Sequence, residues 1–234
     1  MLKCRPARGL SMVELMVGVT IGLFVVAGAG MLAASQLSDN RRLLLETQVQ
    51  QDLRATADII ARELRRSGHW AKARDGVWYE GSAAVRSNPY GGLTSAEGGA
   101  ELQDGDVTNA VLLNYSNKGD EALEDDAVAA NEQRGFRLDN GTIQTQLGAG
   151  NWQALTDSNT LRVTGFSITT QSKPVQLACT KDCPGGGQAC WPVLAVRELT
   201  IDITGEAAHD AAVQRSVRST VRLRNDPVTG SCPA

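Results

Sequence analysis

The chain has 234 residues, a formal net charge of −3 and an apolar content of 42%. This length allows one globular core together with an extended element, and it argues against two globular domains of equal size. The slightly acidic balance argues against a nucleic-acid-binding protein, because such proteins present a basic face to the phosphate backbone.

The first predicted element is an apolar segment, residues 10–34, in which Glu14 is the only charged residue. A helix rises about 1.5 Å per residue, so this segment reaches roughly 37 Å and can cross a hydrocarbon core of about 30 Å. The basic residues Lys3, Arg5 and Arg8 precede it, and a long chain follows it. This asymmetry predicts a single-pass membrane helix with a cytoplasmic N-terminus and an extracytoplasmic remainder. A cleaved secretory signal fits less well, because its apolar region is shorter and rarely holds a carboxylate.

The helical pattern continues beyond the membrane segment. Residues 37–67 contain neither proline nor glycine, and Gly68 follows them as a C-terminal cap. One stripe of this part of the helix is apolar: Val49, Leu53, Ile60 and Leu64. We therefore predict one helix over residues 10–67, whose second half buries its stripe against a sheet. In the first half, Gly18 and Gly22 have the spacing of a small-residue packing face, and a flexible anchor is the equal alternative.

Beyond Gly68 the sequence changes to short apolar runs between turn residues. An irregular connection is expected over residues 69–106, and Asn140 followed by Gly141 marks a hairpin turn. The last two runs are expected to pair, with ordinary charge pairs between acidic residues and arginines across the strands. The predicted strands are residues 77–79, 107–116, the hairpin 136–147, 161–171, 193–204 and 217–226. Residues 68–234 are thus expected to form one β-rich domain, and the whole chain an α+β fold.

The stretch "RGLSMVELMVGVTIG" resembles the type III leader of type IV prepilins. A short basic leader, residues 1–9, ends in Gly9, and the apolar Leu10 follows it. Glu14 is the fifth residue counted from Leu10. Within that superfamily, "LRATADIIARELRRSGHW" and the closing "VRLRND" resemble the PilW-type minor pilins. The resemblance implies the type IV pilin-like fold, in which a long N-terminal helix packs on an antiparallel sheet.

The resemblance also implies a processing site and an assembly site. A prepilin peptidase would cut between Gly9 and Leu10, and the new amine of Leu10 would be N-methylated. The family most often has phenylalanine at this position, so Leu10 departs from its pattern. In the family the glutamate neutralises the amine of a neighbouring subunit and sets the axial register of the filament, and Glu14 occupies that position here. A carboxylate that reaches the lipid headgroups is the alternative role for Glu14.

The cysteines predict disulfides in the exported part of the chain. Cys4 lies in the expected leader, and four cysteines remain after its removal: Cys179, Cys183, Cys190 and Cys232. An even number on the oxidising side of a membrane favours two disulfides, and three pairings are possible. If all four cysteines pair, Cys232 must bond to one of the other three, which staples the C-terminal tail to a glycine-rich loop. A tetrathiolate zinc site fits less well, because only Cys179 and Cys183 approach the usual spacing of a ligand pair.

Other candidate chemistry in the sequence is weak. Five acidic residues lie close together: Asp120, Glu121, Glu124, Asp125 and Asp126. Their spacing is not that of an EF-hand, so we expect a solvated acidic loop and not a calcium site. His69 and His209 are far apart, and no serine or cysteine stands in a recognised nucleophile arrangement. We expect neither an enzyme nor a bound metal or cofactor.

These expectations combine into a structural protein of a bacterial type IV pilus, a fimbrium that supports twitching motility and cell adhesion. By resemblance, PilW-type proteins help to start pilus assembly near the tip, together with other minor pilins, the major pilin and often a large adhesin. The subunit would reside in the inner membrane before it enters the periplasm and the pilus. A J-type minor pseudopilin of type II secretion is the first alternative, because it shares the leader, helix and sheet. A membrane-anchored periplasmic binding or sensor protein, which would keep residues 1–9, is the second.

Overall fold

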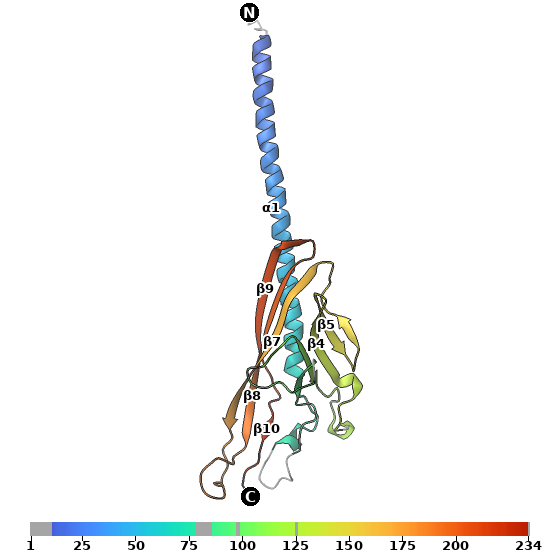
Figure 1. Ribbon diagram of the computed structural model, residues 1–234, viewed down its shortest axis with the longest axis vertical. Coiled ribbons are helices and arrows are strands. Elements are labelled where there is room, and N and C mark those ends of the chain that lie inside the picture. Colours follow the sequence, from blue (N-terminus) through green and yellow to red (C-terminus); the bar gives the residue numbers. More distant parts are fainter. Residues whose placement is uncertain (1–10, 78–85, 97–98, 125, 234) are drawn as a thin grey trace, which may run out of the picture. The chain divides into compact units, whose positions relative to one another are not determined.

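The computed structural model describes residues 11–77, 86–96, 99–124 and 126–233. It contains two compact units, Met1–Leu45 and Glu46–Ala234, and each is described by itself. Helix α1, Met12–Arg66, contributes its first part to one unit and its last part to the other (Figure 1). The prediction of one long N-terminal helix is therefore confirmed.

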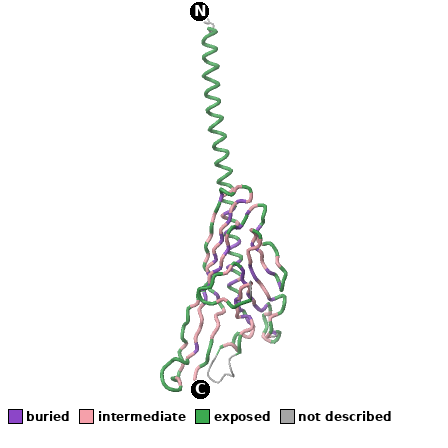
Figure 2. The backbone as a smooth tube through the Cα atoms, in the orientation of Figure 1, coloured by how far each residue is buried: buried purple, intermediate pink, exposed green. Residues whose placement is uncertain are grey.

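The last part of α1 buries the predicted apolar stripe. Each of its four residues is at most 1% exposed: Val49, Leu53, Ile60 and Leu64. Figure 2 shows these buried positions within the second unit, whereas the described residues of α1 before Leu45 are exposed. The helix lies against a strand at Gly205, where an added Cβ atom would sit 3.4 Å from Leu53 Cδ2 and 2.7 Å from Leu161 Cδ1. A larger residue at Gly205 would therefore separate the strand from its neighbours.

One antiparallel sheet, which we call sheet B, supplies this contact. Its strands follow the order β10-β8-β7-β2, and β9 also pairs with β8. The bounds are β2 Val107–Thr108, β7 Leu161–Gln176, β8 Val193–Ala207, β9 Asp210–Arg222 and β10 Val228–Thr229. The predicted alternation in β8 is confirmed, because Leu199, Ile201 and Ile203 are fully buried and the residues between them are less buried. The predicted hairpin of the last two runs is β8 and β9, although β9 begins earlier and ends earlier than predicted.

A second antiparallel sheet, sheet A, has the order β1-β3-β4-β5-β6. Its strands are β1 Leu93–Ser95, β3 Ala110–Asn114, β4 Gln133–Asp139, β5 Thr142–Leu147 and β6 Trp152–Ala154. The predicted hairpin at Asn140 and Gly141 is confirmed, since both residues have positive φ angles, 47° and 78°. Short 3-10 helices lie at Ala73–Gly76 (η1), Glu121–Leu123 (η2) and Ala130–Glu132 (η3).

One strand prediction is wrong, and another falls largely outside the described residues. The single strand expected over residues 107–116 is wrong, because the run divides between the sheets: β2 joins sheet B and β3 joins sheet A. The Thr108 hydroxyl donates to the Ala110 carbonyl at 2.8 Å and accepts from the Ala110 N–H at 3.1 Å, which turns the chain between the two strands. Of the strand expected at 77–79, Val77 follows η1 and the other two residues lie outside the described part.

Candidate functional site

The first turn of α1 places the carboxylate of Glu14 on the start of the helix. Glu14 Oε2 accepts a hydrogen bond from the Ser11 N–H at 3.0 Å, and Ser11 Oγ accepts one from the Val13 N–H at 3.4 Å. The Glu14 bond is one half of a capping box. The serine hydroxyl caps the amide of Val13 instead of that of Glu14, so each side chain satisfies one free amide at the start of the helix. The Ser-x-x-Glu spacing was readable in the sequence, so this local role of Glu14 could have been predicted. The predicted cleavage and methylation positions, Gly9 and Leu10, lie outside the described residues.

Residues 15–34 of α1 present an exposed surface that is almost wholly apolar. Within the described residues, α1 is the one helix long and apolar enough to cross a membrane. Its large side chains are exposed, for example Phe24 at 80% and Val25 at 65%. At Gly18 and Gly22 an added Cβ atom would meet nothing within 4 Å, so both backbones are accessible to an external helix. This surface fits a membrane anchor, and a specific packing role for the two glycines stays a prediction.

The C-terminal end of α1 is fastened by side chains from distant parts of the chain. Gly68 has a φ of +74°, and its N–H donates to the Asn114 carbonyl at 2.9 Å. Asn225 Nδ2 donates to the Ser67 carbonyl at 2.9 Å, and Asn88 Nδ2 donates to the Gly68 carbonyl at 2.8 Å. These bonds satisfy carbonyl groups that a helix end leaves without partners. The "ND" of the closing "VRLRND" therefore contributes a helix-capping asparagine.

A buried arginine holds this capping segment in place. Arg197 donates from one terminal nitrogen to the Gly91 carbonyl at 2.8 Å and from the other to the Asn225 carbonyl at 3.0 Å. Its backbone N–H donates to an Asp226 carboxylate oxygen at 3.0 Å. Burial lowers the pKa of the Arg197 guanidinium, and the charge of Asp226 opposes that shift. The sequence pattern did not distinguish Arg197 from the exposed arginines, so this structural role was missed.

A tyrosine joins α1 to sheet A near the same end. The buried Tyr115 hydroxyl donates to Glu63 Oε2 at 2.8 Å and accepts from Arg134 Nε at 3.1 Å. The guanidinium carbons of Arg66 and Arg134 lie 4.2 Å and 5.3 Å from the centre of the Tyr115 ring. Burial, followed by the contact with Glu63, raises the pKa of Tyr115. The ring therefore fixes the last turns of α1 to the sheet through both polar and cation–π contacts.

The acidic segment is not the solvated loop that its composition predicts. Glu124 is only 5% exposed, and its Oε1 lies 2.8 Å from the hydroxyl of Tyr90, a residue that is fully buried. The same hydroxyl lies 2.9 Å from Oε2 of Glu132, which is 1% exposed and also accepts the N–H groups of Asn117 and Ala129. Burial, reinforced by both carboxylates, raises the pKa of Tyr90.

Basic residues pair with two further acidic residues of this segment, Glu121 and Asp126. Asp126 Oδ2 lies 3.0 Å from Lys72 Nζ and 2.7 Å from an Arg86 terminal nitrogen, and these two cations lower the pKa of Asp126. Glu121 pairs with Arg74 at 2.6 Å. The prediction failed because the partners come from residues 72–86, far away in the sequence. Asp125 lies outside the described residues. In the described part of the chain, no cluster of three His, Cys, Asp or Glu side chains has the geometry to hold a metal ion.

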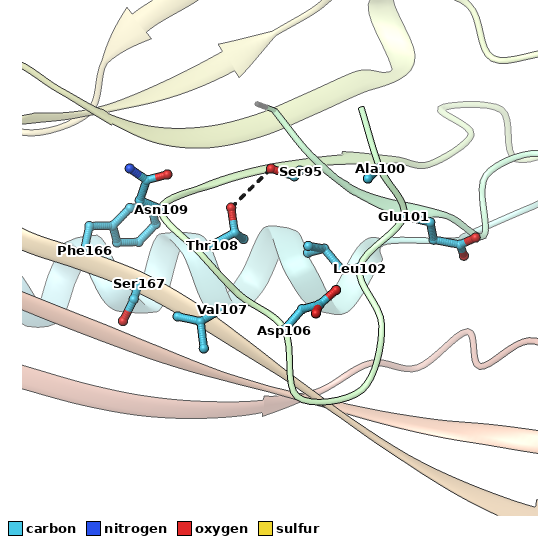
Figure 3. A pocket seen from close by; sticks show the side chains of 10 residues that line it. All are labelled: Ser95, Ala100, Glu101, Leu102, Asp106, Val107, Thr108, Asn109, Phe166 and Ser167. Atoms are coloured by element: carbon cyan, nitrogen blue, oxygen red, sulfur yellow. Dashed lines mark hydrogen bonds between the residues drawn. The ribbon is translucent and has the colours of Figure 1, made fainter. Parts of the chain in front are cut away.

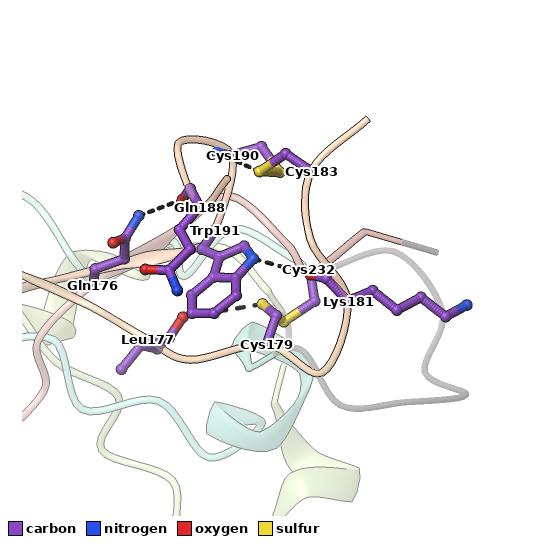
Figure 4. The surroundings of a disulfide bond; sticks show 9 residues. All are labelled: Gln176, Leu177, Cys179, Lys181, Cys183, Gln188, Cys190, Trp191 and Cys232. Atoms are coloured by element: carbon purple, nitrogen blue, oxygen red, sulfur yellow. Dashed lines mark hydrogen bonds between the residues drawn. A yellow bond between two sulfur atoms is a disulfide. The ribbon is translucent and has the colours of Figure 1, made fainter. Parts of the chain in front are cut away.

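The four cysteines form two disulfides, Cys179–Cys232 and Cys183–Cys190 (Figure 4). The first closes a sequence separation of 53 residues and staples the C-terminal tail to the glycine-rich loop, as predicted. The second closes a separation of 7 residues within that loop. The indole N–H of Trp191 donates to the Lys181 carbonyl at 3.0 Å and orders the segment between the two bonds. The pairing that the sequence left open is therefore decided.

The predicted charge pairs between β8 and β9 are present in part. Asp202 and Arg218 are opposite each other in register and form an ion pair at 2.6 Å. Glu198 is opposite Arg222 in register, but Arg222 forms its ion pair with Asp226 at 3.5 Å. The Asp202–Arg218 pair lies on the exposed face of sheet B, where such pairs contribute little to stability, whereas the Asp226 side chain is only 6% exposed.

An open pocket of about 440 Å³ lies where β1 and β2 approach each other (Figure 3). The hydroxyls of Ser95 and Thr108 are 3.4 Å apart at its wall, and Glu101 and Asp106 contribute carboxylates. Asp106 accepts a hydrogen bond from the Gln103 N–H at 2.7 Å, so it orders its own loop. The lining side chains include no histidine, lysine or cysteine, so this pocket offers no familiar nucleophile and base pair.

The comparison with protein families matches residues 42–223, the last part of α1 and most of both sheets, to the family described as Prepilin peptidase-dependent protein B. The comparisons with curated proteins and with solved structures gave no match. The family match covers more than half of the chain and includes Tyr115, Arg197 and both strands of the last hairpin. The chain therefore belongs to the Prepilin peptidase-dependent protein B family.

Proposed function

We propose that the protein is a minor pilin, a structural component that helps to start assembly of a type IV pilus near its tip. One observation carries the proposal: a single carboxylate, Glu14, lies in the first turn of an exposed apolar helix whose continuation forms the core of a pilin-like domain. The family match supports it, because the family is described by its dependence on prepilin peptidase. No step of this role requires catalysis, and we propose that the protein is not an enzyme.

Processing would create a cationic partner for Glu14. In this proposal the prepilin peptidase cuts between Gly9 and Leu10, which releases a positively charged amine at Leu10, and the amine is then N-methylated. An ionised carboxylate in a membrane segment is costly without such a partner. The capping bond to the Ser11 N–H satisfies part of the carboxylate, and an amine from a neighbouring subunit would neutralise its charge. The pairing would set the axial register between two subunits.

Membrane insertion and helix packing would follow from the same surface. The apolar part of α1 would hold the subunit in the inner membrane, with its N-terminus in the cytoplasm and its domain in the periplasm, until extraction into the pilus. The accessible backbones at Gly18 and Gly22 would allow close approach of other pilin helices. Partners in this proposal are the prepilin peptidase, the major pilin, other minor pilins and a large tip adhesin.

Two Glu14 variants separate the register role from the capping role. Glu14→Gln keeps an oxygen that can accept the Ser11 N–H but removes the charge, whereas Glu14→Ala removes both. We expect the leader of both variants to be cleaved, and both variants to be absent from sheared pili. Mass measurement of protein from membranes and from sheared pili reports cleavage, methylation and pilus entry together. Normal entry of Glu14→Gln into pili would contradict the register mechanism.

Deletion of the gene distinguishes this function from the alternatives. A minor pilin predicts loss of surface pili, of twitching motility and of adhesion, with protein secretion intact. A type II secretion pseudopilin predicts the opposite result. A mature protein that retains residues 1–9 would support a membrane-anchored binding or sensor protein and would contradict the pilus proposal.

A further inference from the structure

Most strand edges of the two sheets are short or covered. The edge strands β1 and β6 have three residues each, and β2 and β10 have two each. The start of β8 is covered by β10 and by a hydrogen bond from the Ala195 N–H to the Pro227 carbonyl at 3.0 Å. Along β7, Thr170 bonds to the loop that precedes β2, and the far end carries Lys173 and Pro174. Short edges, lysine and proline are the usual protections against the addition of a further strand.

Strand β9 is neither short nor covered by another strand among the described residues. Its 13 residues contain neither proline nor lysine, and among the described residues β9 pairs with β8 alone (Figure 1). The N–H of Leu223, just after β9, donates to the Arg197 carbonyl at 3.0 Å in the same register as the β8–β9 pairs. Antiparallel ladders alternate, so the even-numbered residues from Ser216 to Arg222 direct their N–H and C=O groups away from β8. A row of backbone groups therefore faces an open edge.

The charged side chains of residues 211–222 are arginines, and each of them pairs with a carboxylate of the same chain. Arg218 and Arg222 lie on the exposed face, with side chains 74% and 64% exposed, and Thr220 lies between them. Residues 211–222 contain no acidic side chain. Arg218 contacts one carboxylate, Asp202, and Arg222 contacts one, Asp226. A guanidinium has five N–H donors, so both arginines retain donors for a further carboxylate.

We propose that the edge of β9 binds an extended acidic segment of another polypeptide, which adds to sheet B as a further strand. Backbone hydrogen bonds supply the attachment, and two carboxylates four residues apart in the partner lie opposite Arg218 and Arg222. A hydroxyl side chain between them fits opposite Thr220. A second copy of this chain is a poorer occupant, because its own β9 brings arginines instead of carboxylates. This proposal is independent of the pilus function.

Peptide binding to the full chain in detergent micelles tests the proposal. The probe is a fluorescent peptide, Thr-Val-Glu-Val-Thr-Val-Glu-Val-Thr, and its control has lysine in place of both glutamates. We expect the acidic peptide to bind at least about tenfold more tightly than the lysine peptide. Raising the salt concentration should weaken its binding, because the charge pairs are exposed. Equal affinity for the two peptides, or no binding of the acidic one, would overturn the proposal.

Variants locate the binding to the edge. Thr220→Pro removes an N–H that faces the open edge and leaves the bonds to β8 in place, so affinity should fall about tenfold. Arg218→Ala should also weaken binding. Its matched control is Arg162→Ala. Arg162 belongs to β7, on the other side of β8, its side chain is 70% exposed, and it pairs with Glu206 of β8. Loss of affinity in Arg162→Ala to the same extent as in Arg218→Ala would contradict a site at β9.

Amide hydrogen exchange on the unaltered chain gives a test that does not depend on folding of a variant. The acidic peptide should slow exchange at Ser216, Arg218 and Thr220, whose N–H groups face the edge. Val217 and Ser219 already donate to β8, so their exchange should change little. Protection at another strand in place of these residues, or dimerisation of the chain through β9, would overturn the proposal.

Discussion

The two parts of α1 bury their apolar side chains in different ways. From Val49 to Leu64 the apolar stripe is covered by sheets of the same chain. The part of α1 before Leu45 has more large apolar side chains than the part after it, and these side chains are exposed. Apolar surface of this extent is not stable in water, so its burial must come from lipid or from other helices. One helix thus depends on two environments, and only one of them is supplied by the chain.

The charged groups show the same contrast. In the first part, Glu14 contacts only the amide of Ser11 within the described residues. In the domain, buried Glu124 and Glu132 receive donors from several segments of the chain. Changes within the domain should therefore alter its stability, whereas changes in the first part of α1 should alter membrane insertion or assembly. The following predictions test this division, in order of decreasing effect.

The largest effect is expected for the disulfide that holds the C-terminal tail. Replacing Cys179 and Cys232 by serine should lower the free energy of unfolding of the domain by about 4 kcal/mol, because the bond closes a long ring. Replacing Cys183 and Cys190 should cost only about 2 kcal/mol, because that ring is short. Urea unfolding of the full chain in detergent measures both values. Equal losses would show that ring size does not govern the difference.

A core variant of α1 should be next. Leu53→Ala should lower the free energy of unfolding by about 3 kcal/mol, because Leu53 is fully buried against the strand at Gly205. Val25→Ala, in the exposed part, is the control and should change the same quantity by less than about 0.5 kcal/mol. Similar losses of unfolding free energy in the two variants would contradict the claim that only the last part of α1 stabilises the domain.

The cap at the end of α1 should have a smaller effect. Asn225→Ala leaves the Ser67 carbonyl without its donor and should cost about 1–2 kcal/mol of unfolding free energy. Asn159→Ala removes an exposed amide that donates to the exposed Asp157, and it should change stability by less than about 0.5 kcal/mol. The same urea titration compares the two. If Asn159→Ala lowers the free energy of unfolding as much as Asn225→Ala does, the hydrogen bond to Ser67 stabilises the domain no more than an exposed contact does.

The smallest effect is a pH dependence at Glu124. Burial alone raises the pKa of this carboxyl, but hydrogen bonds from Ser116, Tyr90 and the Ala71 N–H outweigh burial, so the pKa is lowered. A lowered pKa gives stability that is present above the unfolded value of about 4.3 and is lost as pH falls through the folded value. Stability of the wild type should therefore fall more steeply below about pH 4.3 than that of Glu124→Gln. Equal slopes in acid urea titrations would contradict this role of Glu124.

Local patterns in the sequence predicted several elements correctly. The helix, its buried stripe, the turn at Asn140–Gly141 and the hairpin of the last two strands each depend on residues close together in the chain. The strand expected over residues 107–116 failed for the opposite reason. Its residues have strand character throughout, but the bend after Thr108 sends each half to a different sheet. The point at which these residues pass from one sheet to the other depends on where the two sheets lie, which local sequence patterns do not show.

The sequence by itself determined the long helix, its two kinds of surface, the four cysteines that follow the helix and the resemblance of the leader. Tertiary structure decided which cysteines pair, which cations neutralise the acidic segment, which arginine is buried and which strand edge stays open. The physical reason is range: helix periodicity and turn chemistry act within a few residues. Ion pairs such as Asp126 with Lys72, or the cap from Asn225 to Ser67, join residues that approach only after the sheets have formed.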